Sequence, residues 1–220
     1  KNILTRPLSR TELMAQFSLS PEDLNPRLEG VLGRLRQARA QRVPPHRDEK
    51  IIVSWNALTI SALALGAQVL GEEKYYAAAA RAARFILEEM LREGRLFRIW
   101  TAGVVSVPGF SEDYAFLAQA LLDLYETDFD PAWLAAAIRL VAGLEELFLD
   151  EDGTYFYVAR DQEAAVVRSK SIFDVTLPAG NSMAARVFLR LYRITGEERY
   201  RQRALGILSR FQSQALESPW

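Results

Sequence analysis

Apolar residues recur at helical spacing in six long segments of this chain, and the segments fall into three pairs. The predicted helices span residues 54–70 and 73–92, 112–126 and 131–148, and 181–194 and 197–216. Within each pair the connection is a tight turn, at Gly71, Asp128 or Gly196. Because short connections join antiparallel neighbours, the pattern predicts an all-α fold with three antiparallel helical hairpins over residues 54–216.

The N-terminal residues 1–45 predict two further helices. Ser9 has capping-box spacing to Glu12, which is typical of a helix start. Ser20 begins the next helix, in which an apolar stripe runs among many arginines and is expected to form one buried face. We interpret this stretch as an N-terminal helical segment of a single domain that spans residues 1–220.

The connections between the pairs are much longer than the turns within them. They carry alternating apolar and polar residues, which predict two small β-hairpins, at residues 96–100 with 104–107 and at residues 154–158 with 165–167. Loops of this length in a compact domain are usually functional or disordered, and their aromatic content favours order. The long connections are expected at the end of the molecule opposite to the tight turns.

Each hairpin's first helix opens with a dense polar cluster. These clusters are Ser54-Trp55-Asn56, Ser111-Glu112-Asp113-Tyr114 and Gly180-Asn181-Ser182. In a row of antiparallel pairs the first helices all run in the same direction, so their N-termini are expected on one face. Helix N-termini carry unpaired N–H groups and a partial positive charge, which suit bound hydroxyls or anions.

Composition excludes several classes of function. Twenty-seven basic and 28 acidic residues give a formal net charge of −1, which favours neither nucleic acid nor an anionic membrane surface as a partner. The chain has no cysteine and a single histidine, His46, so we predict no metal site and no cofactor. The apolar run at residues 57–70 is short and mixed, and no signal peptide is recognised, so we expect a cytoplasmic protein. The chain starts without methionine, which suggests a piece of a longer protein.

Several motifs along the chain resemble those of a known family. They are Pro45-His46-Arg47-Asp48-Glu49-Lys50, Ser54-Trp55-Asn56, Gly109-Phe110-Ser111-Glu112-Asp113-Tyr114-Ala115, Arg168-Ser169-Lys170, Asp174 and Pro178-Ala179-Gly180-Asn181-Ser182. With these motifs the chain resembles the spermatogenesis-associated, thioredoxin-like family, over nearly its whole length. Members of that family join a thioredoxin-like domain to a helical region similar to six-hairpin glycosidases and sugar epimerases.

The resemblance implies an α/α toroid built from helical hairpins, with the small β-hairpins on one face. Three hairpins would form only part of a closed ring of six. The thioredoxin-like domain is absent from these residues, so it is expected as a partner rather than as part of the fold. An open ring would expose apolar helix faces, which makes homo-oligomers plausible.

The candidate catalytic groups are the carboxylates of Glu112, Asp113 and Asp48. Glu112 and Asp113 stand at a helix start, where acidic residues commonly serve as caps. Hydrolysis of a sugar bond needs two carboxyl groups on either side of that bond. Neighbouring residues of a helix point in different directions, so a second carboxylate would come from Asp48 or Asp174.

Eight further residues are candidates for binding a substrate. They are Lys50, Trp55, Asn56, Tyr114, Arg168, Lys170, Asp174 and Asn181. The tryptophan offers a flat apolar face to a sugar ring, and the two cations of the long connection would bind a carboxylate or phosphate. Each also has a purely structural interpretation, as a core residue, an ion pair or a helix cap.

Two functions fit these features. The first is a carbohydrate-active or carbohydrate-binding domain, resembling a glycoside hydrolase or a sugar isomerase or epimerase, with a sugar or sugar acid as ligand. Epimerases of related fold use paired histidines, and a single His46 argues against that chemistry within this chain. The second is a non-catalytic scaffold or protein-interaction domain that supports the absent thioredoxin-like domain. Convergence of the polar clusters in a pocket favours the first, and their dispersal into caps and ion pairs favours the second.

Overall fold

The computed structural model describes residues 5, 7–162, 167–170 and 173–217. These residues belong to two compact units, Lys1–Asp48 and Glu49–Trp220, each of which is described by itself. The assignment of the whole chain to one domain therefore stays a prediction.

The N-terminal unit contains α1 (Arg10–Phe17) and α2 (Pro21–Ala40). The predicted capping box of α1 is confirmed, because the Ser9 hydroxyl accepts a hydrogen bond from the Glu12 N–H and the Glu12 carboxylate accepts one from the Ser9 N–H. The prediction of a buried face on α2 is wrong within this unit. Leu32 and Leu35 are exposed, and Leu24 is the one buried residue of α2.

The second unit contains six α-helices in the part of the chain that the structure describes. They are α3 (Val53–Leu70), α4 (Glu73–Phe85), α5 (Ser111–Asp128), α6 (Pro131–Phe148), α7 (Gly180–Thr195) and α8 (Glu198–Glu217). The predicted bounds are confirmed to within two residues except at the end of α4. There a π-helical turn, Ile86–Met90, leads directly into a strand, so the prediction of helix up to residue 92 is wrong.

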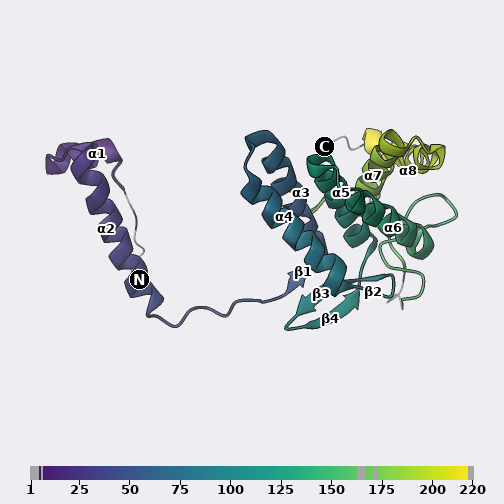
Figure 1. The fold of residues 1–220 in the computed structure, drawn as a ribbon, viewed down its shortest axis with the longest axis horizontal. Coiled ribbons are helices and arrows are strands. Elements are labelled where there is room, and N and C mark those ends of the chain that lie inside the picture. Colours follow the sequence, from purple (N-terminus) through teal and green to yellow (C-terminus); the bar gives the residue numbers. More distant parts are fainter. Residues whose placement is uncertain (1–4, 6, 163–166, 171–172, 218–220) are drawn as a thin grey trace. The chain divides into compact units, whose positions relative to one another are not determined.

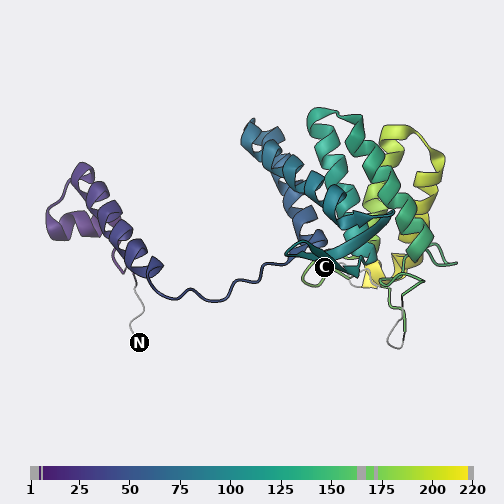
Figure 2. The ribbon, with the colours of Figure 1, turned by 60° about the horizontal axis from the view of Figure 1, so that its bottom comes forward.

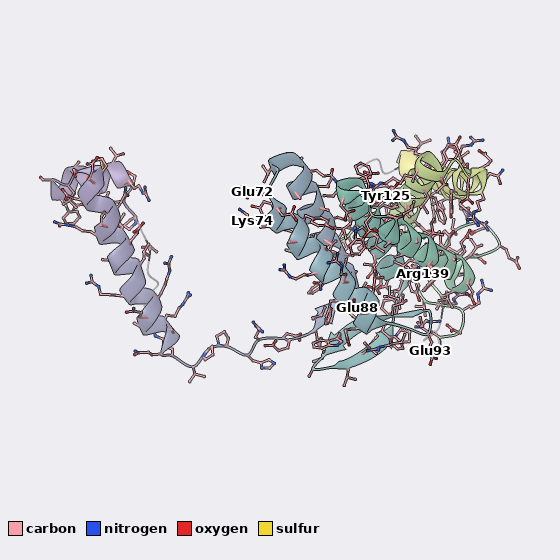
Figure 3. The ribbon with its side chains drawn as sticks, viewed as in Figure 1. Glu72, Lys74, Glu88, Glu93, Tyr125 and Arg139 are labelled. Atoms are coloured by element: carbon pink, nitrogen blue, oxygen red, sulfur yellow. The ribbon has the colours of Figure 1, made fainter. Side chains whose placement is uncertain are left out.

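The helices of the second unit are arranged as antiparallel hairpins (Figure 1). The first helices of the pairs form a row in which α5 packs between α3 and α7, and each packs against its own partner helix, α4, α6 or α8. The central helix α5 is buried almost all round from Ser111 to Leu124. The outer helices expose charged side chains such as Lys74 of α4 and Arg139 of α6 (Figure 3). This architecture confirms the predicted all-α class with hairpins of an α/α toroid.

A small antiparallel sheet covers the N-terminal end of α3. Its strands are β1 (Ile51–Ile52), β2 (Leu91–Arg92), β3 (Arg95–Thr101) and β4 (Val104–Pro108). The order is β1-β3-β2, and β4 also pairs with β3, so the first predicted hairpin is confirmed. Figure 2 shows the tight turns at one end of the helices and the sheet at the other, as predicted.

The second predicted hairpin is not formed by the described residues. Residues 154–158 contain a single bridge, between Leu149 and Tyr155, and no strand. In the predicted second strand of this hairpin, Ala165 and Val166 lie outside the described residues. The connection is instead ordered by hydrogen bonds such as that from the Tyr157 N–H to the Ser169 carbonyl, at 2.8 Å.

Helix α3 has the length and composition of a membrane-spanning segment, although the sequence run at residues 57–70 was expected to be too short and mixed. The core helix of a soluble protein meets the same criterion of length and apolar composition. In the structure α3 packs against α4, α5 and the sheet, and 33% of its residues are buried there.

The turn of the β3–β4 hairpin predicts a stabilising substitution. Ala102 has φ +50° and Gly103 φ +88°, the values of a type I′ turn, which favours Asn-Gly because Asn tolerates positive φ. Ala102→Asn should therefore raise the free energy of unfolding by about 0.5–1 kcal/mol in urea denaturation.

Ala62→Asn is the matched control, because Ala62 is an exposed position of α3 with ordinary helical geometry. This substitution should lower stability by up to about 0.7 kcal/mol, since Asn is the poorer helix former. A loss of stability in both variants would contradict the turn assignment.

Candidate functional site

The N-termini of α3, α5 and α7 meet at one end of the molecule. The Ser54 N–H donates a hydrogen bond to the Asp113 carboxylate at 3.1 Å, which joins α3 to α5. Gly180 of α7 approaches so closely that an added Cβ would lie 3.3 Å from the Ser111 hydroxyl and 3.4 Å from the Glu112 nitrogen. The prediction that these N-termini gather on one face is confirmed. We call the residues Ser54, Trp55, Arg98, Glu112, Asp113, Tyr157 and Gly180 the polar rim.

Asp113 is the carboxylate of the polar rim that has no exposed surface. Its carboxylate accepts hydrogen bonds from the Ser54 N–H, from the Phe110 N–H at 2.9 Å, and from Arg98 Nη1 at 2.9 and 3.1 Å. Burial raises the pKa of Asp113, and the Arg98 guanidinium and the backbone N–H of Phe110 oppose that rise. With no exposed surface and hydrogen bonds to three partners, Asp113 holds the starts of α3 and α5 and the strand β3 together.

Glu112 is the carboxylate of the polar rim that retains access to solvent. Arg98 Nη1 donates to its Oε1 at 2.7 Å, and the Tyr157 hydroxyl donates to the same oxygen at 3.3 Å. The Glu112 side chain is 14% exposed. Burial, followed by the negative charge of Glu112, raises the pKa of Tyr157 to about 12, so this hydroxyl stays protonated and keeps donating its hydrogen bond.

Arg98 and Tyr157 are central to the polar rim, and sequence reasoning missed both. Arg98 extends from β3 over the Phe110 ring, with 5.0 Å between its guanidinium carbon and the ring centroid. Phe110 in turn stacks on Tyr157 at 4.5 Å between centroids. The signal for Arg98 was an arginine at the centre of a strand, between the apolar residues Phe97 and Ile99.

The predicted cations Arg168 and Lys170 form a separate cluster. Arg168 donates twice to the Val158 carbonyl, at 2.8 and 3.1 Å, and its guanidinium lies 4.0 Å from the centroid of the Phe156 ring. Lys170 pairs with Asp150 and, at 2.7 Å, with Asp152. Both cations are thus engaged in ordering the long connection.

Three other predicted binding residues are also engaged in structural contacts. The Asn181 amide both accepts from the Tyr155 N–H and donates to the Tyr155 carbonyl, each at 2.9 Å, as a neighbouring strand would. Asp174 accepts a hydrogen bond from the Ala179 N–H at 2.8 Å. Asn56 donates to the Ile52 carbonyl at 2.9 Å. These contacts fix the starts of α3 and α7.

Tyr114 lies in the core and not at a surface. It is 1% exposed, its hydroxyl accepts a hydrogen bond from the Leu96 N–H at 2.9 Å, and its ring packs on Phe148. An added Cβ at Gly143 would lie 3.1 Å from that ring. This placement gives Tyr114 a packing role in the core, and its part in substrate binding stays a prediction.

The remaining predicted residues are exposed. Trp55, in the first turn of α3, is 58% exposed. Lys50 immediately precedes β1. Asp48 is the last residue of the N-terminal unit, so its position relative to the polar rim is not defined.

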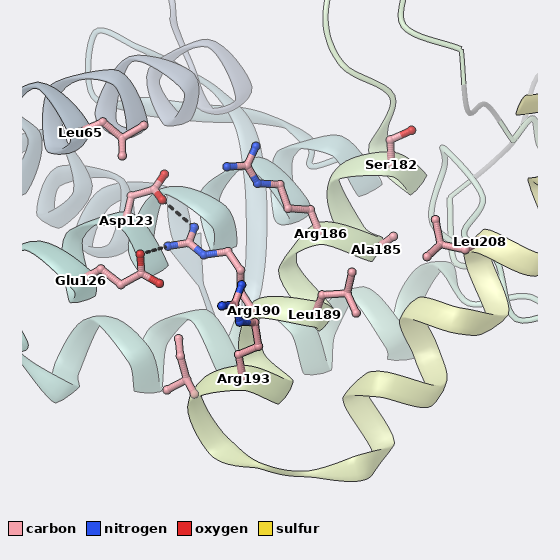
Figure 4. A pocket seen from close by; sticks show the side chains of 11 residues that line it. Leu65, Asp123, Glu126, Ser182, Ala185, Arg186, Leu189, Arg190, Arg193 and Leu208 are labelled. Carbon is pink, nitrogen blue, oxygen red and sulfur yellow. Dashed lines mark hydrogen bonds and ion pairs between the residues drawn. The ribbon is translucent and has the colours of Figure 1, made fainter. Parts of the chain in front are cut away.

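A groove runs along α7 from its first turn. It has a volume of about 730 Å³ and is lined by residues of α3, α5, α7 and α8, namely Leu65, Asp123, Glu126, Ser182, Ala185, Arg186, Leu189, Arg190, Arg193, Ile194 and Leu208 (Figure 4). None of these side chains was a predicted site residue. We call this feature the α7 groove.

Comparison with solved structures identifies the class of fold. The chain is similar to a family 76 α-mannanase from Bacteroides thetaiotaomicron, with a TM-score of 0.60 and 21% identity, over 80% of this chain and 46% of that one. It is similar to a cellobiose 2-epimerase from Spirochaeta thermophila, with a TM-score of 0.62 and 17% identity, over 87% and 56%. At these identities the likeness establishes the α/α-toroid fold and no activity.

Comparison with curated sequences identifies the particular relatives. The chain is 32% identical over 231 aligned residues to human spermatogenesis-associated protein 20, and 34% identical over 212 to a protein of Caenorhabditis elegans. It spans 29% of the length of each. No family model matches the sequence. The predicted resemblance is thus confirmed: the chain is related to one part of the spermatogenesis-associated proteins.

The geometry of the polar rim predicts unequal effects of its two carboxylates on stability. Asp113→Ala removes the acceptor of Ser54, Phe110 and Arg98 and leaves a poorly exposed guanidinium short of a partner, which should cost about 3–5 kcal/mol. Glu112→Gln leaves the Arg98–Asp113 pair intact and should cost about 1 kcal/mol or less. Urea denaturation measures both, and equal losses would contradict the assignment of Asp113 as the structural group.

Proposed function

We propose that the polar rim binds carbohydrate, with Trp55 as the surface on which a sugar ring stacks. The observation that carries this proposal is an exposed indole in a helix turn whose backbone is hydrogen-bonded to the buried Asp113. Ser54, the preceding residue, is tied by its N–H to Asp113, so the first turn of α3 is held in place. A rigid aromatic side chain loses little conformational entropy when a ligand packs on it, which favours binding.

Glu112 supplies the polar contact of the proposed site. Its carboxylate is partly exposed, and one oxygen is oriented by Arg98 and Tyr157. The oriented carboxylate would accept hydrogen bonds from sugar hydroxyls. In a hydrolytic reaction the same group would be the acid or base. The enclosed Asp113 would not take part in proton transfer.

The names of the solved structures with this fold support carbohydrate as the ligand class. They include a mannanase, cellobiose 2-epimerases and a D-mannose isomerase, all of which act on sugars. Fold alone does not fix function, so the support comes from the coincidence of a sugar-associated fold with an exposed indole and an oriented carboxylate. A cytoplasmic location remains part of the proposal.

A specific observation favours a second function, a non-catalytic scaffold. Most of the predicted site residues are engaged in caps, core packing or ion pairs, as Asp113, Tyr114, Lys170 and Asn181 are. Such a domain would position a partner, for instance a thioredoxin-like domain, or associate with a second copy of itself. The two functions differ in whether Trp55 is needed for a sugar to bind.

Thermal-shift measurements with mannose, cellobiose and mannan oligosaccharides test the first function. A ligand of the native state raises the unfolding midpoint in proportion to its occupancy, so at least one of these sugars should raise the Tm. Trp55→Ala should weaken that binding about tenfold or more, because the loss of a stacked aromatic face removes about 1.5–3 kcal/mol. Val69→Ala, which truncates another exposed apolar side chain of α3, is the matched control. Absence of any shift would leave the scaffold as the function.

Glu112→Gln separates binding from catalysis. If the polar rim hydrolyses mannan oligosaccharides, this variant should lower kcat at least about a hundredfold while the midpoint of unfolding changes little. Product analysis by chromatography gives the rate. Turnover that is equal in Glu112→Gln and in the unchanged chain would exclude Glu112 as acid or base.

A further inference from the structure

Three arginines follow one another along the exposed face of α7. Arg186, Arg190 and Arg193 are spaced by four and three residues, so they lie in one stripe on the helix surface. All three line the α7 groove, opposite Leu65 of α3 (Figure 4). The outermost two are seven residues apart, about 10 Å along the helix axis. A ligand of the size of one or two sugar rings would span them.

The central arginine is fixed by two carboxylates of α5. Arg190 Nη1 donates to Asp123 at 2.6 Å, and Arg190 Nη2 lies 2.9 Å from Glu126. Asp123 is buried and also accepts hydrogen bonds from the Gln119 amide at 3.1 and 3.2 Å. This network makes Arg190 a rigid part of the groove wall and consumes most of its hydrogen-bonding capacity.

The two outer arginines are differently placed. Arg186 and Arg193 are exposed, and neither guanidinium forms an ion pair or hydrogen bond with any residue in the part of the chain that the structure describes. Three guanidiniums against the carboxylates of Asp123 and Glu126 leave the groove with one excess positive charge. That charge complements a single anionic group on a ligand.

Other lining groups suit a ligand that is hydroxylated as well as anionic. Glu126 is nearly half exposed, so its carboxylate can accept hydrogen bonds from hydroxyls. Leu65, Leu189 and Leu208 are exposed apolar side chains that offer contact to the C–H faces of a sugar ring. The volume of about 730 Å³ lies within the usual range of small-molecule sites.

We propose that the α7 groove is a binding site for a sugar acid, whose carboxylate is held by Arg186 or Arg193 and whose hydroxyls are held by Glu126 and the other arginine. This inference rests on the proposed carbohydrate function and names the class of sugar. The groove begins at Ser182, two residues after Gly180 of the polar rim, so a longer acidic oligosaccharide would reach from one feature to the other.

Calorimetric titration of the full chain with glucuronate and with glucose tests the inference. Glucuronate should bind at least about tenfold more tightly, because it gains a charge-assisted contact that glucose lacks. The double variant Arg186→Gln/Arg193→Gln should abolish this preference, so that glucuronate binds no more tightly than glucose. Arg81→Gln, at an exposed position of α4 outside the groove, is the matched control and should retain the preference. Raising the salt concentration should weaken binding of glucuronate and not that of glucose.

The outcomes separate this inference from the proposed function. Equal affinities for the two sugars, or a preference that survives in the double variant, overturn the sugar-acid site, while a loss of binding in Trp55→Ala would still support the polar rim. If binding of glucuronate depends on the arginines but not on Trp55, the α7 groove is supported as the sugar site and the polar rim is excluded as one. A dimer in size-exclusion chromatography that Arg186→Glu/Arg193→Glu dissociates would show that a second copy occupies the groove, and would also overturn the proposal.

Discussion

The buried ion pair between Arg98 and Asp113 is the interaction on which the arrangement of the helix N-termini depends. One carboxylate joins the start of α3, the start of α5 and the strand β3 through hydrogen bonds to Ser54, Phe110 and Arg98. A carboxylate without exposed surface is costly unless each charge is paired and hydrogen-bonded. Because the buried carboxylate needs all of these hydrogen bonds at once, the ion pair also fixes how α3, α5 and β3 are placed relative to one another.

This constraint explains why so many polar side chains of the helix starts are not free for chemistry. Each α-helix begins with N–H groups that have no partner within the helix. In a row of packed helices those groups are poorly exposed, and side chains from neighbouring elements satisfy the surrounding backbone. Asn181 does so for Tyr155, and Asp174 does so for Ala179. Many of the polar side chains that predicted a site in the sequence therefore attach the long connections to the helices.

The helices were predictable from the sequence because their signals are local. The capping box at Ser9, the Asp130-Pro131 start of α6 and the turn at Gly196 each specify a boundary within a few residues. Convergence of the N-termini was also predictable, since it follows from the antiparallel order of the hairpins. The roles of individual side chains were not, because they depend on contacts across the chain. Glu112 and Asp113 are adjacent in the sequence, yet only the packing of α3 and β3 makes one enclosed and the other accessible.

The α7 groove is a candidate site that the sequence alone did not predict. In the sequence, the stripe formed by Arg186, Arg190 and Arg193 is typical of the solvated face of an amphipathic helix. Their significance appears only with the acidic end of α5 beside them. Pairing with Asp123 and Glu126 satisfies Arg190 and leaves the arginines on either side without partners. On a freely solvated surface an unpaired arginine needs no explanation, but these two flank a fixed ion-pair network in a groove with exposed leucines. A concave wall with rigid polar contacts, apolar patches and one uncompensated charge has the composition of a binding site.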